Sequence, residues 1–119
     1  MAAPNLLNVH TITAKSVFAE LTTSDTDILE NEAFSNKLYK LNNIIVSNID
    51  GTNPADVTVS VNRGGVAYKI ASTISVPADS TLVLIDKNTF IYLEEEDKIS
   101  ALAGANSDLN IFINYEELS

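Results

Sequence analysis

The chain has 119 residues, 16 acidic and 7 basic side chains, a net charge of −9, one histidine, and neither cysteine nor tryptophan. This length fits one compact domain, and the lack of cysteine excludes disulfide frameworks, thiolate metal sites and cysteine nucleophiles. Because the basic residues are few and scattered, they are not expected to neutralise a phosphate backbone, so nucleic-acid binding is not predicted. The apolar stretches are short, so neither a signal peptide nor a membrane span is expected.

Most of the chain alternates between apolar and polar residues, the pattern of β-strands with one face in a core and the other in water. In the clearest segment, 56–62, Val57, Val59 and Val61 are predicted to point inward. The candidate strands, in chain order, are 9–13, 17–21, 38–46, 56–62, 66–70, 81–85, 90–93, 99–103 and 109–115. The same alternation predicts inward side chains in two further strands, at Val66, Tyr68 and Ile70 and at Leu109, Ile111, Ile113 and Tyr115.

Turn-forming residues separate these strands. Gly64 and Gly65 give the sharpest signal, because a two-residue hairpin turn requires positive φ. Segment 25–34 could form a short helix, but an irregular loop between strands is favoured. The pattern predicts an all-β fold, a single antiparallel β-sandwich of jelly-roll or immunoglobulin type with about eight or nine short strands. Residues 1–8 are expected to form an N-terminal arm or first strand, and residues 9–119 the sandwich.

Few residues suggest chemistry. His10 lies on a candidate strand without a second histidine, and a structural role is expected. The acidic run 94–97 and the loop 50–56 carry the oxygen atoms that Ca²⁺ prefers, but neither matches the spacing of a calcium-binding loop. The serine-nucleophile motif of hydrolases does not occur. We therefore expect no catalytic residue, no metal, no cofactor and no enzymatic activity.

A surface that binds protein is the remaining expectation. The edges and end loops of a sandwich can bind partners, and the apolar N-terminal segment could add a strand to a neighbouring sheet. The residues predicted to face a partner are Leu6 and Leu7 in the N-terminal arm and Glu94, Glu95 and Glu96 at a charged rim. An alternative is a carbohydrate- or receptor-binding module in which the acidic run holds Ca²⁺ beside a glycan.

Three parts of the chain resemble a known family. They are the segment 5–13, the segment 44–60 with the run Ile-Val-Ser-Asn-Ile-Asp-Gly-Thr-Asn-Pro-Ala-Asp-Val-Thr-Val-Ser-Val, and the segment from Val76 onward, which contains Val-Pro-Ala-Asp-Ser-Thr-Leu-Val-Leu-Ile-Asp-Lys-Asn-Thr-Phe-Ile-Tyr-Leu-Glu-Glu-Glu-Asp-Lys-Ile. These segments resemble small virion structural proteins of tailed bacteriophages, in particular those of marine cyanobacterial phages. The resemblance covers most of the chain and rests on strand and turn patterns, so it brings no catalytic residue with it.

The resemblance implies a small β-sandwich on the phage particle, made in the host cytoplasm and incorporated into the virion. The role it implies is a capsid decoration or cement protein that bridges subunits of the major capsid protein, with a neck or tail component as the alternative. Symmetric self-association is expected, with a trimer favoured, and a membrane partner is not. In the resembled pattern a turn glycine precedes Asp97, whereas this chain has Glu96, which argues against a tight positive-φ turn there.

Overall fold

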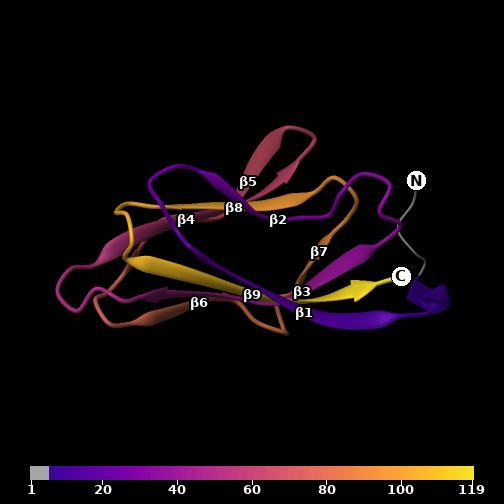
Figure 1. Ribbon diagram of the computed structural model, residues 1–119, viewed down its shortest axis with the longest axis horizontal. Helices are drawn as coiled ribbons and strands as arrows, with labels where there is room; N and C mark the ends of the chain where they lie inside the picture. Colours follow the sequence, from indigo (N-terminus) through magenta and orange to yellow (C-terminus); the bar gives the residue numbers. More distant parts are fainter. Residues whose placement is uncertain (1–5) are drawn as a thin grey trace.

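Residues 6–119 are described by a computed structural model of the chain, and within this range nine β-strands form two antiparallel sheets packed face to face (Figure 1). The five-stranded sheet has the order β1-β9-β3-β6, with β7 also paired to β3. Its strands are β1 (Ile12–Glu20), β3 (Leu38–Asn48), β6 (Thr81–Ile85), β7 (Ile91–Leu93) and β9 (Leu109–Leu118). The four-stranded sheet has the order β2-β8-β4-β5. Its strands are β2 (Thr26–Glu30), β4 (Ala55–Arg63), β5 (Val66–Val76) and β8 (Lys98–Ala103).

The strand order distinguishes between the two kinds of sandwich that the sequence allows. If the three-residue β7 is set aside, each sheet has four strands, and the long connections cross from one sheet to the other, as in a jelly roll. The predicted antiparallel β-sandwich is therefore confirmed, and its topology is that of a jelly roll. The one helical element in the described range is a short 3₁₀ turn, η1 (Leu6–Asn8), and no helix there is suited to crossing a membrane.

The core lies between the two sheets and is built by the predicted alternation. Val57 and Val59 are completely buried, and so are Leu109, Ile111 and Ile113 of β9. The polar residues between these buried side chains lie on the opposite face of each sheet, because successive side chains of a strand point to opposite faces. Burial of one such aliphatic side chain contributes about 1.5–3 kcal/mol to stability.

The predicted glycine hairpin is also confirmed. Gly64 and Gly65 join β4 to β5 with φ of 61° and 79°, so both residues adopt the left-handed conformation that a type I′ turn requires. The inward orientation predicted for Val66 and Tyr68 is wrong, because their side chains are 50% and 60% exposed. The tip of this hairpin projects away from the opposite sheet (Figure 1). Side chains on either face of the tip are therefore exposed to solvent, whatever their alternation.

Two further boundaries differ from the prediction. Segment 25–34 contains the strand β2, neither a helix nor a wholly irregular loop, and β2 pairs with β8 and buries Leu29. A bulge between Asp27 and Leu29 interrupts its alternation, which hides the strand in the sequence. The predicted strands 9–13 and 17–21 overlap a single continuous strand, β1, and residues 9–11 lie outside it. Residues 1–5 of the predicted arm lie outside the described residues.

Candidate functional site

The acidic run forms the turn between β7 and β8. The backbone N–H of Asp97 donates to the carbonyl of Glu94 (3.0 Å), and the N–H of Glu94 donates to Asp97 Oδ2 (2.8 Å). Glu96 has φ of 74°, so the expectation that this position would avoid a left-handed turn is wrong. Asn31 holds the turn in place, because its carbonyl accepts from the N–H of Glu96 (2.6 Å) and its own N–H donates to the carbonyl of Asp97 (3.0 Å).

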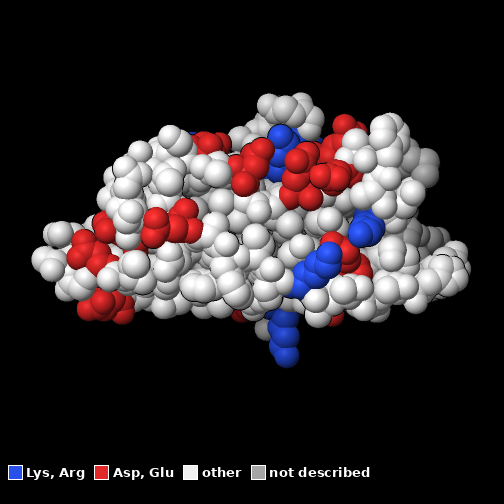
Figure 2. Space-filling model, in the orientation of Figure 1, with Lys and Arg blue, Asp and Glu red and all other residues white. Residues whose placement is uncertain are grey.

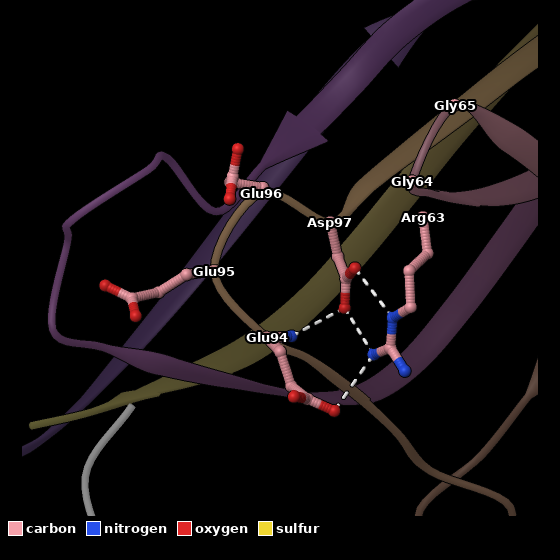
Figure 3. Close-up of a pocket in the computed structure, with 7 residues that line it drawn as sticks. All are labelled: Arg63, Gly64, Gly65, Glu94, Glu95, Glu96 and Asp97. Carbon is pink, nitrogen blue, oxygen red and sulfur yellow. Dashed lines mark hydrogen bonds and ion pairs between the residues drawn. The ribbon is translucent and has the colours of Figure 1, made fainter. Parts of the chain in front are cut away.

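Arg63, at the end of β4, ties this turn to the glycine hairpin. Its Nε and Nη2 donate to the two carboxylate oxygens of Asp97 at 2.8 and 2.5 Å, and Nη2 also lies 3.1 Å from Glu94 Oε2 (Figure 3). Asp97 is 2% exposed, so this is a nearly buried carboxylate with three donors. Hydrogen bonding to Asp97 raises the pKa of Arg63 further above its usual value.

Of the three predicted rim acids, Glu94 is therefore engaged by Arg63, and Glu95 accepts a hydrogen bond from the backbone N–H of Asn36 (2.8 Å). Figure 3 shows the side chains of Glu95 and Glu96 pointing away from Arg63. Among residues 6–119, no three acidic or histidine side chains form a group that could hold a metal ion. The cation-dependent glycan-binding alternative therefore has no such side-chain cluster to support it in the described part of the chain.

In the loop between β3 and β4, the carboxylate of Asp50 likewise binds groups of the protein itself. Asp50 Oδ1 accepts hydrogen bonds from the backbone N–H groups of Thr52 (2.8 Å) and Asn53 (3.3 Å). These bonds lower the pKa of Asp50, because they stabilise the carboxylate. The loop is held by its own polar groups, as a connection between strands requires.

The two predicted apolar contacts lie elsewhere. Leu6 and Leu7 belong to η1 and are 54% and 92% exposed. In Figure 1, η1 lies beside the C-terminal end of β9, well apart from the β7–β8 turn. The structure thus does not bring the five predicted partner-binding residues together on one surface.

A surface that the sequence analysis missed lies on the outer face of the five-stranded sheet. The register aligns Phe18 of β1 with Phe112 of β9, Phe112 with Ile45 of β3, and Ile45 with Val83 of β6. Residues opposite one another in antiparallel strands point to the same side, so these four side chains form one row, called here the apolar stripe. Phe18 and Val83, at its two ends, are 65% and 55% exposed. The rings of Phe18 and Phe112 meet edge to face with centroids 5.2 Å apart.

Polar residues border the apolar stripe. In the neighbouring row, Ser16 Oγ donates to Asn114 Oδ1 (2.6 Å), and Asn114 Nδ2 donates to Asn43 Oδ1 (2.7 Å). This row fixes three adjacent strands to one another on the solvent side. A rigid apolar strip with a polar margin is the usual anatomy of a surface that contacts another protein.

A second charged cluster joins β1, β9 and the residue that precedes β3. Lys15 and Lys37 lie 3.0 and 3.1 Å from the carboxylate of Glu117, which is 7% exposed. Burial raises the pKa of Glu117, but the two ammonium groups outweigh this effect and leave the pKa below its usual value. The rings of Tyr39 and Tyr115 pack beside one another, with centroids 5.1 Å apart, and burial together with the charge of Glu117 raises the pKa of Tyr39 to about 12.

Among residues 6–119, ion pairs thus use four of the seven basic side chains and four of the sixteen acidic ones. Figure 2 shows basic side chains beside acidic ones at the top and on the right of the visible face, whereas the acidic groups on the left have no basic neighbour. The remaining acidic excess favours solubility of the separate chain. Among the described residues, we take the apolar stripe as the candidate contact surface.

Comparison with solved structures gives a likeness of fold. No protein-family model matches the chain, and no curated protein matches it. Among solved structures, the chain is similar to a protein of Bacillus endospore appendages, which form a family of disulfide-linked pili, with a TM-score of 0.54 and 20% sequence identity. The match covers 92% of this chain and 88% of that one. At this identity the likeness shows a shared sandwich fold over nearly the whole chain.

Proposed function

We propose that the chain is a non-enzymatic structural protein of a tailed-phage virion, a decoration or cement protein that bridges subunits of the major capsid protein. The observation that carries the proposal is the apolar stripe, which crosses four strands of a rigid sandwich and is exposed at both ends. The acidic turn is the weaker candidate, because Arg63 engages Asp97 and Glu94 and a backbone N–H engages Glu95. The resemblance of the sequence to virion proteins supports a location on the virion.

The structural neighbour supports an assembly role in general terms. That protein belongs to pili linked by disulfides, so a sandwich of this kind serves there in an assembly. The present chain has no cysteine, so its own contacts with other chains cannot be disulfides. Many copies on a shell gain avidity from multivalency, and a rigid sheet presents its contact face with little entropy loss.

Quantitative mass spectrometry of gradient-purified phage particles tests this proposal. We expect the chain to co-purify with infectious particles in a copy number comparable to that of the major capsid protein. A copy number that fits a single ring would instead indicate a neck or tail component. Absence from purified particles would refute a virion role altogether. Empty heads lacking tails serve as the matched control, because a head protein remains on them and a tail protein does not.

A further inference from the structure

The edge of β1 differs from the other sheet edges of the described chain. β1 pairs with β9 through nine successive residue pairs, from Ile12 with Leu118 to Glu20 with Asn110, without a register shift. On its other side β1 has no neighbouring strand among residues 6–119. Every second residue of such an edge directs its N–H and C=O outward, where only water or another strand can satisfy them.

The remaining edges carry features that discourage pairing. β2 and β6 have only five residues each, and the pairing of each with its neighbour contains a bulge. β5 is longer, but its register with β4 shifts twice, and Thr73 within it has φ of 52°. Bulges and short strands are the usual protection of an exposed edge. β1 is therefore the long, regular edge that this part of the chain leaves open.

The side chains of β1 favour a second copy of the same strand as the occupant. Phe18 ends the apolar stripe at this edge and is 65% exposed. If β1 meets another β1 in antiparallel register with Phe18 opposite Phe18, Ser16 lies opposite Glu20 and the apolar stripe runs on without interruption into the second molecule. In this register residues 16–20 of the two copies face one another, and the one charged residue of this segment, Glu20, lies opposite the uncharged Ser16, so no two like charges meet across the contact. The edge strand β2, in contrast, carries two acids and no base.

We propose that two copies of this protein associate through antiparallel pairing of their β1 strands about a two-fold axis beside Phe18. The two five-stranded sheets then form one continuous sheet, in which residues 16–20 of the two edges pair with one another and the two phenylalanines cover one another. The contact is isologous, since the same residues serve on both molecules. This inference goes beyond the proposed function, because it holds whether or not the protein belongs to a virion. It replaces the trimer expected from the sequence with a two-fold dimer.

Single-cysteine cross-linking tests the pairing directly, since the chain has no cysteine of its own. Phe18→Cys places two thiols opposite one another at the axis, and mild oxidation is expected to give a disulfide-linked dimer. Ser16→Cys lies opposite Glu20 of the second copy, and Val83→Cys lies at the far edge of the sheet, so neither variant should form a disulfide-linked dimer under the same oxidation. All three positions are solvent-exposed, which limits damage to the fold. Equal cross-linking of Val83→Cys, preferential cross-linking of Ser16→Cys, or none with Phe18→Cys would each overturn the proposal.

Sedimentation of the unmodified protein provides a second, independent test. The wild-type chain should sediment as a dimer, and Phe18→Lys, which places two ammonium groups at the axis, should raise the dimer dissociation constant by about tenfold or more. Val83→Lys is the matched control, because it makes the same change on the same face away from the axis, and it should leave the dimer intact. A monomeric wild type, or a dimer that Phe18→Lys does not weaken, would overturn the inference and leave the virion proposal untouched.

Discussion

Replacement of Arg63 with methionine is expected to lower the free energy of unfolding by about 2–3 kcal/mol. The change removes two of the three donors to Asp97, whose side chain is 3% exposed, and leaves a buried carboxylate with only the N–H of Glu94. Breaking a fully buried ion pair costs about 3–5 kcal/mol. The expected value is smaller, because the Arg63 side chain is 53% exposed and water screens the pair.

A double-mutant cycle separates this pair from other effects. Asp97→Asn keeps the size of the side chain and an acceptor for the N–H of Glu94, and the coupling between Arg63→Met and Asp97→Asn should be about 1–2 kcal/mol. Glu94→Gln is the matched control, because its ion pair with the same guanidinium is exposed, and it should cost less than about 1 kcal/mol.

Urea denaturation followed by far-ultraviolet circular dichroism measures all four variants of the cycle and the control. Changes in the transition midpoint at constant slope report stability alone. If Arg63→Met differed from the wild type by less than about 0.5 kcal/mol, or if the two substitutions were additive, the pair would not hold the β7–β8 turn to the hairpin.

Three further changes test other parts of the structure. Glu96→Gly should raise the unfolding free energy by about 0.5–1 kcal/mol, because glycine adopts the observed positive φ without steric cost, and a loss of stability would contradict this reasoning. Because the pKa of Glu117 is lowered in the fold, its contribution is present above its ordinary pKa of 4.5 and lost as pH falls through the folded value. The stability difference between the wild type and Glu117→Gln should therefore shrink in acid, and a difference that grew would show the opposite shift. Tyr39 should ionise near pH 12, so Tyr39→Phe should remove that step from a near-ultraviolet absorbance titration, whereas a step that persisted would belong to another residue.

The sequence predicts those strands and turns whose conformation follows from a single local pattern, such as alternation or a pair of glycines. Alternation identifies β4 and β9, because the valines and isoleucines on one face of each strand are buried without exception at their centres. Gly64 and Gly65 identify their hairpin, because a primed turn needs positive φ at both positions. β2 escapes detection, since it has five residues and a bulge, and its strand character depends on pairing with β8.

The candidate site depends on contacts between residues that are far apart in the sequence. Arg63 and Asp97 are 34 positions apart, and only the approach of the β4–β5 hairpin to the β7–β8 turn makes them a pair. The apolar stripe is partly visible in the sequence. Ile45 and Phe112 each lie between two buried apolar residues, at positions where alternation predicts a polar side chain. That Phe18 and Val83 lie in the same row could not be predicted from the sequence, because it depends on the register of four strands.

Gold-labelled antibody microscopy on purified phage particles tests the virion assignment most directly. We expect label spread over the head, at the density of a protein that repeats across the capsid surface, and none on particles of an unrelated phage prepared in parallel. Label confined to the neck or tail would contradict the decoration role, and particles without label would contradict a place in the virion.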